Sequence, residues 1–202
     1  KDISGEEVRI GVFVCNCGSN IGGIANVPEI VEFAKELPNV RHVEENQFSC
    51  SQDTQNNIAQ TIRELGLNRV VVAACTPRTH EPLFQETIRE TGLNPYLFEM
   101  ANIRNQCTWV HSKEKDAATL KAKDLVRMSV ARANLLQPLE QPTIGVNNTA
   151  LVVGGGLSGM TAALSLADQG FATTLVESTP ELGGQALKLI TTWDGIPVQQ
   201  QL

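Results

Sequence analysis

The sequence predicts an α/β protein: a first domain built on a parallel sheet, followed by the beginning of a second α/β domain. Up to residue 136, apolar runs alternate with patterns of helical spacing. A segment rich in proline and asparagine follows, and beyond it a glycine-rich turn separates a strand pattern from a helix pattern. Alternating strands and helices are typical of parallel sheets whose crossover helices cover both faces.

In the first domain, residues 8–15 (VRIGVFVC) and 69–74 (RVVVAA) form apolar runs typical of central parallel strands. A second strand region is expected to begin at 40–43, and a weaker strand is expected at 95–98. Ser51 and Asp53 are polar residues that suit the start of a helix, and apolar residues follow them at helical spacing. The helices are expected at 28–37, 51–65, 80–91 and 113–136.

The domain boundary is expected in residues 137–148 (QPLEQPTIGVNN), a composition that suits a linker. This divides the chain into domains at 1–140 and 149–202. In the second domain, a strand at 149–154, a helix at 157–169 and a strand at 172–177 form a βαβ unit. A complete dinucleotide-binding domain needs more strands. Leu202 is therefore not expected to be a natural domain boundary.

Composition excludes several classes of function. The net charge of −6 and the lack of a run of Lys or Arg argue against nucleic acid as a partner. No apolar stretch reaches the ~18 residues of a membrane span, and the first residues lack a secretion signal pattern. Five cysteines without the compact spacing of a secreted scaffold predict reduced thiols. We expect a cytoplasmic protein.

The cysteines form the first candidate site. Cys15 and Cys75 end the two central strands, and Cys50 precedes a helix, so the carboxyl edge of the sheet can bring them together. Cys17 and Cys107 could complete the group. Four thiolates suit zinc or an iron–sulfur cluster, but close Cys-x-x-Cys pairs, which are usual for zinc, are absent from the sequence. A [4Fe–4S] cluster is therefore the preferred interpretation.

Other interpretations of the cysteines stay open. Cys15 and Cys75 could be small buried apolar residues, and a thiol that precedes a helix could serve redox chemistry. Which four of the five would bind a cluster is not decided by spacing. Arg78 and His80 follow Cys75 closely and could donate hydrogen bonds to cluster sulfurs.

The second candidate site is a nucleotide fingerprint. Gly154, Gly156 and Gly159 form a G-x-G-x-x-G between a strand and a helix, and Glu177 ends the next strand at the distance expected for a carboxylate that binds ribose hydroxyls. A second glycine pair soon after Glu177 resembles the FAD-type version of the motif in two-dinucleotide-binding flavoproteins, so FAD is preferred to NAD in this Rossmann-like unit. The residues expected to bind the cofactor are Gly154, Gly156, Leu157, Ser158, Gly159, Glu177, Ser178, Gly183, Gly184 and Gln185.

Taken together, these motifs resemble the A subunit of heterodisulfide reductase and related proteins of anaerobic archaea and bacteria. The resemblance rests on VCNCG at 14–18, FSCS at 48–51, ACTPRTHE at 74–81, NIRNQCTWVH at 102–111, ALVVGGG at 150–156 and GMTAA at 159–163. It implies a cluster domain joined to a thioredoxin-reductase-like FAD domain. The implied activity is that of an oxidoreductase subunit that passes electrons between FAD and iron–sulfur clusters, in several members by flavin-based bifurcation.

The resemblance also implies partners. These are other heterodisulfide reductase-like subunits and an electron-donating hydrogenase or dehydrogenase, and the full-length protein could be a homodimer. This fragment of the family's length is not expected to perform the whole reaction, and it is expected to bind FAD weakly or only with the rest of the domain. Two alternatives remain: an FAD- or NAD-dependent oxidoreductase without a cluster, and a zinc-stabilised docking domain.

Overall fold

The computed structural model describes residue 3 and residues 5–198. The chain divides into two compact units, Lys1–Gln141 and Pro142–Leu202. Each unit carries a parallel sheet with helices, which confirms the predicted α/β class.

The first unit is built on a four-stranded parallel sheet with the strand order β2-β1-β3-β4. Its strands are β1 (Ile10–Cys15), β2 (Val40–Asn46), β3 (Arg69–Ala74) and β4 (Phe98–Asn102). Every residue of the central strands β1 and β3 is buried, as their continuous apolar runs predict. Each fully buried Val or Ile side chain contributes about 1.5–3 kcal/mol to folding. The chain order reverses direction across the sheet between β1 and β3.

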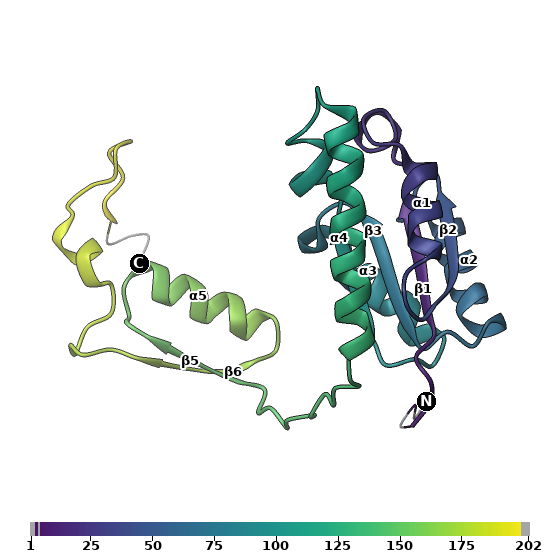
Figure 1. Cartoon of the computed structure of the whole chain (residues 1–202). Coiled ribbons are helices and arrows are strands. Elements are labelled where there is room, and N and C mark those ends of the chain that lie inside the picture. The colour runs from purple at the N-terminus through teal and green to yellow at the C-terminus, as the bar shows by residue number, and fades with distance from the viewer. Residues whose placement is uncertain (1–2, 4, 199–202) are drawn as a thin grey trace. The chain divides into compact units, whose positions relative to one another are not determined.

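Two helical layers cover this sheet (Figure 1). On one face α1 (Val27–Lys35) packs against α4 (Lys115–Leu135), and on the other α2 (Gln52–Glu64) packs against α3 (Pro77–Glu90). Helix α1 lies on the face opposite to α2 and α3, because right-handed crossovers that run in opposite directions across the sheet place their helices on opposite faces. Helix α4 lies close to the strands because it buries mostly small residues at helical spacing, namely Ala118, Ala122, Val126, Val130 and Ala133.

Two predicted boundaries were wrong. The last strand of this sheet covers Phe98–Asn102 rather than 95–98, because Asn94 and Leu97 close a turn through a 3.0 Å backbone hydrogen bond and Pro95 has no N–H to donate. Helix α3 begins at Pro77 rather than at 80, because the Thr76 side chain caps it and proline suits the first helical turn.

The second unit contains the predicted βαβ element. Strands β5 (Thr149–Val153) and β6 (Ala172–Val176) pair in parallel, and α5 (Leu157–Asp168) packs on them. Neither strand nor the helix contains a fully buried residue. Leu151 and Val153 are 67% and 79% exposed. The fold of this unit therefore depends on far less apolar burial than that of the first.

Candidate functional site

Cys15 and Cys75 lie side by side at the carboxyl edge of the first sheet. Cys15 is the last residue of β1, and Cys75 follows β3 directly. These are the neighbouring strands between which the chain order reverses. In open parallel sheets such a switch point, at the carboxyl ends of the strands, is the usual place for a ligand. Both thiols are buried.

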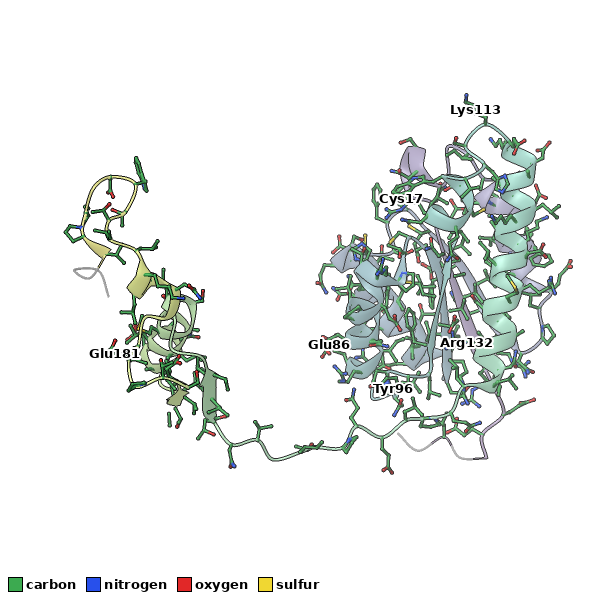
Figure 2. The ribbon with its side chains drawn as sticks, turned by 90° about the vertical axis from the view of Figure 1, so that its left-hand side faces the viewer. Cys17, Glu86, Tyr96, Lys113, Arg132 and Glu181 are labelled. Atoms are coloured by element: carbon green, nitrogen blue, oxygen red, sulfur yellow. The ribbon has the colours of Figure 1, made fainter. Side chains whose placement is uncertain are left out.

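Cys17 and Cys50 approach the same edge from two loops. Cys17 precedes a short 3-10 helix (Gly18–Asn20), and Figure 2 shows it at the end of the unit away from Tyr96. Cys50 follows β2 and precedes α2, which is capped by the Ser51 side chain. Cys50 is exposed and Cys17 is half-buried. Solvent therefore reaches this edge from the side of these two loops.

The four sulfur atoms interact electrostatically. Burial raises the pKa of the Cys15 thiol, the neighbouring Ser49 lowers it, and the charges of Cys17 and Cys50 raise it further. Burial likewise raises the pKa of the Cys75 thiol, Arg104 lowers it, and Cys50 and Cys15 raise it. These effects place Cys15 near Cys17 and Cys50, and Cys75 near Cys15 and Cys50.

Ser49 and Arg104 support this group from outside it. The backbone N–H of Ser49 donates to Cys15 Sγ at 3.5 Å. Arg104 is placed by Ile103, whose N–H donates to Ala74 O at 2.9 Å beside Cys75. Sequence reasoning missed both roles. It considered Arg78 and His80, with helix capping and solvent contact as the alternative, whereas among the described residues Arg104 is the basic side chain that acts on Cys75.

Arg104 is itself held in place. Its guanidinium carbon lies 4.7 Å from the centroid of the Trp109 ring, and its Nε donates to Asn105 Oδ1 at 3.1 Å. The Trp109 Nε1–H donates in turn to Asn20 Oδ1 at 3.1 Å. The loop after Cys17 and the segment around Cys107 are thus tied together near Cys75.

Cys107 stands apart from the other cysteines. It lies in a π-helical turn (Arg104–Thr108), and its side chain is completely buried. Its thiol donates to Ala118 O in α4 at 3.0 Å. Burial raises its pKa and the charge of Lys121 lowers it, with no contribution from another cysteine. The structure therefore gives Cys107 a packing partner of its own.

The donor set at the sheet edge consists of thiols. In the part of the chain that the structure describes, no three His, Cys, Asp or Glu side chains are close enough to share one metal ion. A zinc ion needs all of its sulfur ligands about 2.3 Å from one point, whereas a four-iron cluster is held at its corners by thiolates further apart. The four cysteines at the sheet edge offer the number and the type of ligands that such a cluster needs.

In the second unit, the fingerprint forms a tight turn around three glycines. Gly154 has φ +106°, which side-chain-bearing residues rarely adopt. A Cβ on Gly159 would lie 1.8 Å from Gly154 O, so the helix can approach the strand only with glycine there. Gly156 caps α5, and a Cβ on it would meet no atom within 4 Å.

An open pocket of about 650 Å³ lies at this turn, lined by Gly154, Gly156, Leu157, Ser158, Gly159, Gly183 and Gln185 among others. The first N–H groups of α5 have no partners within the helix and carry the positive end of its dipole. They are suited to an anion. This pocket contains seven of the ten residues predicted to bind the cofactor.

Glu177 and Ser178 hold the base of the turn. Glu177 Oε2 accepts from Gly155 N at 2.6 Å, while Oε1 accepts from the backbone N–H groups of Ser178 (2.7 Å) and Thr179 (2.9 Å). These hydrogen bonds lower the pKa of Glu177 to about 2. Ser178 thus contacts Glu177, and the carboxylate is ionised at neutral pH.

Gly183 and Gly184 bring the following turn against the fingerprint. Gly183 N donates to Gly155 O at 2.7 Å, and Gly183 forms a parallel bridge with Gly156. A Cβ on Gly184 would lie 3.1 Å from Gly156 Cα. A second open pocket of about 500 Å³ follows, lined by Glu177, Gly184 and Gln185 among others. All ten predicted residues therefore lie in one region, nine in the walls of the two pockets and Ser178 bonded to Glu177.

Comparisons with known proteins cover both units of the chain. Residues 150–201 match the family described as FAD dependent oxidoreductase. Over 188 residues (93% of this chain) the sequence is 54% identical to the second iron-sulfur A subunit of the CoB--CoM heterodisulfide reductase of Methanopyrus kandleri. The chain is homologous to the A subunit of heterodisulfide reductase. The resemblance seen in the sequence motifs is thereby confirmed.

Further relatives extend this finding. The A subunit of the H(2):CoB-CoM heterodisulfide,ferredoxin reductase of Methanothermobacter thermautotrophicus is 50% identical over 96% of the chain. A protein of Archaeoglobus profundus described as similar to the heterodisulfide reductase A subunit is 50% identical over 93% of it. The chain spans only 29%, 29% and 27% of the length of these three relatives. Within residues 5–198, no helix is long and apolar enough to cross a membrane.

Proposed function

We propose that this chain is the cluster-binding and FAD-binding portion of an electron-transfer subunit in a heterodisulfide reductase-like complex. The observation that carries the proposal is the convergence of Cys15, Cys17, Cys50 and Cys75 on the carboxyl edge of one parallel sheet. The relatives named as iron-sulfur subunits support the same assignment.

We assign the cluster ligands to Cys15, Cys17, Cys50 and Cys75, and a structural role to Cys107. Cys17 and Cys50 act electrostatically on Cys15, and Cys15 and Cys50 act on Cys75, whereas the Cys107 thiol donates a hydrogen bond to Ala118 O. A [4Fe–4S] cluster bound there exchanges single electrons. The chain's own contribution is to hold four thiolates, to partly bury them, and to place the Arg104 charge beside Cys75.

We assign FAD to the glycine turns of the second unit. The N-terminus of α5 and the space beside Gly156 suit a pyrophosphate, and the ionised Glu177 suits ribose hydroxyls. FAD supplies two-electron chemistry that can be divided into single-electron steps. The chain's part is to bind and orient it, and the match of residues 150–201 to an FAD-dependent family supports this role.

The activity of the whole protein follows from that of its relatives. We propose an oxidoreductase subunit that moves electrons between FAD and iron–sulfur clusters, with bifurcation as the specific form. Its partners would be further heterodisulfide reductase-like subunits and a hydrogenase or dehydrogenase, and two full-length copies could associate. All five cysteines are free, as is usual in a reducing compartment, so we place the protein in the cytoplasm.

Anaerobic purification with reconstitution tests the proposal. Iron, sulfide, zinc and flavin are measured on one sample, and an absorption spectrum is recorded. We expect about four irons and four sulfides per chain, with a broad band near 400 nm. Dialysis against FAD at high concentration then measures flavin binding separately.

The alternatives give different results. Zinc without iron would indicate a zinc-stabilised docking domain. Bound FAD without iron would indicate a flavin- or nicotinamide-dependent oxidoreductase that has no cluster. Either result, or a chain that binds no metal after reconstitution, contradicts the proposed electron-transfer role of the first unit.

A further inference from the structure

Ser49 lies between two of the proposed cluster ligands. It immediately precedes Cys50 in the loop between β2 and α2. Its backbone N–H donates to Cys15 Sγ, at the end of a different strand, over 3.5 Å. The side chain of Ser49 is completely buried. A serine at this place is therefore enclosed by the cysteine group and the core beneath it.

The hydroxyl of Ser49 is a buried polar group that lies beside Cys15, the one group it affects among the described residues. Within the described part of the chain, Ser49 Oγ makes no hydrogen bond of normal geometry, but the Ser49 side chain lies near enough to Cys15 to lower the pKa of that thiol, as its backbone N–H also does. Nearly all buried hydroxyls in folded proteins have a partner, because burying an unpaired donor is unfavourable. A buried donor beside Cys15 that lacks a hydrogen bond of normal geometry is suited to a stronger sulfur acceptor at this position. The sulfur atoms of an iron–sulfur cluster and its thiolates are such acceptors.

Asn46 offers a useful contrast at the end of β2. Its Oδ1 atom is also buried and unpaired among the described residues, while its amide nitrogen donates to Glu44 Oε1 at 2.6 Å. That unpaired atom is an acceptor, which cannot donate to sulfur. Of these two buried groups, only the Ser49 hydroxyl has the chemistry that a sulfur-rich ligand needs.

We propose that the Ser49 hydroxyl donates a hydrogen bond to a cluster sulfur or to the Cys15 thiolate, and that it raises the reduction potential of the cluster. This inference rests on the proposed function. Reduction adds negative charge to the cluster, so a fixed donor stabilises the reduced form more than the oxidised form. Ser49 is a positioning residue for electron transfer in this account, and it does not ligate iron.

The test compares midpoint potentials of the reconstituted chain. Ser49→Ala removes the hydroxyl and keeps the backbone N–H, while Ser49→Thr keeps both. Ser51→Ala is the matched control, because Ser51 lies equally close to Cys50 in the sequence but its hydroxyl caps α2 through Thr54. Iron and sulfide are counted first, and the potential is then measured by anaerobic titration followed by electron paramagnetic resonance.

We expect Ser49→Ala to lower the midpoint potential by the equivalent of about a tenfold change in the reduction equilibrium, or ~59 mV for one electron. Ser49→Thr and Ser51→Ala are expected to keep the wild-type potential. An Ala variant that carries a full cluster at the wild-type potential overturns the inference. A shift of the same size in Ser51→Ala overturns it as well, because the effect would then belong to the loop.

A second variant covers the case in which Ser49→Ala fails to fold or to bind iron. Ser49→Gly also lacks the hydroxyl, and we expect it to lower the midpoint potential by the same amount. An unchanged midpoint potential in this variant would contradict the inference. Failure of the proposed function is distinguishable, because wild-type chain would then take up no iron and sulfide at all. If the wild-type chain binds a cluster but the Ser49 variants have the same midpoint potential as wild type, only the inference about Ser49 is contradicted.

Discussion

The thiol of Cys107 donates a hydrogen bond to the carbonyl oxygen of Ala118, 3.0 Å away, and joins the π-helical turn to α4. We predict that Cys107→Ala lowers the free energy of unfolding by about 1–2 kcal/mol, through a lost hydrogen bond and a small cavity. Cys107→Ser keeps a donor and should lose less. Urea unfolding followed by circular dichroism measures both. An unchanged stability in the alanine variant would argue against a structural role.

Substitutions of two fingerprint glycines should have different effects, one on folding of the turn and the other on cofactor binding. Gly159→Ala places a Cβ against Gly154 O and is expected to disrupt the turn even without flavin. Gly156→Ala meets no protein atom within 4 Å, so the turn should survive while FAD affinity falls at least about tenfold, since the methyl would occupy the space of the pyrophosphate. Gly145→Ala, in the linker, is the control with equally open space and no expected effect.

Backbone amide spectra and FAD titration measure these effects. Should Gly156→Ala bind FAD as tightly as the Gly145→Ala control, the pyrophosphate does not pass beside Gly156.

We predict that the hydrogen bonds between the Glu177 carboxylate and the glycine turn depend on pH. Its pKa is lowered from 4.5 to about 2, chiefly by the Gly155 N–H, so the stabilising hydrogen bonds of the ionised form persist above pH 4.5. They should be lost as the pH falls from about 4.5 through about 2, where the folded carboxylate takes up its proton. The chemical shift of the Gly155 amide should titrate with a midpoint near pH 2. Glu177→Gln should abolish that transition, and a midpoint near 4.5 would contradict the hydrogen-bonded arrangement.

Arg69 fastens the end of α4 from the opposite end of β3. Only 4% exposed, it donates from Nη1 to Asn68 O at 2.8 Å and from Nη2 to Leu136 O at 2.6 Å. We predict that Arg69→Ala costs about 2–3 kcal/mol, because it removes charged hydrogen bonds and opens a cavity. Arg69→Met keeps the apolar stem without a buried charge and should cost less. Thermal and urea unfolding of the two variants compare these costs. Equal losses would mean that the charge, and not packing, dominates.

The central strands of the first sheet could be predicted because their apolar sequences are compatible only with a buried position. The runs at 8–15 and 69–74 are too apolar for a surface, and every residue of β1 and β3 is indeed buried. The edge strand β4 was misplaced because its shorter apolar pattern was taken to start at Pro95, which lies inside a turn. That turn is fixed by the Asn94 side chain, whose Oδ1 accepts from Tyr96 N at 3.0 Å.

The site residues likewise include some that could be predicted from the sequence and some that could not. Residues that end strands could be placed on one edge from the sequence, and Cys15 and Cys75 do lie at the ends of neighbouring strands. Cys107 could not be separated from them, because the π-helical turn that directs its side chain to α4 has no sequence signature. Ser49 and Arg104 were missed because their roles depend on contacts between segments distant in the sequence.

The most direct test of the account is the iron content of five single Cys→Ser variants after identical anaerobic reconstitution. We predict that Cys107→Ser retains about four irons and four sulfides with an unaltered spectrum. The variants at Cys15, Cys17, Cys50 and Cys75 should each lose most of the iron or convert to a cluster with fewer irons. Loss of iron in Cys107→Ser, together with full retention in one of the other four, would contradict the assignment of the cluster to the carboxyl edge of the sheet.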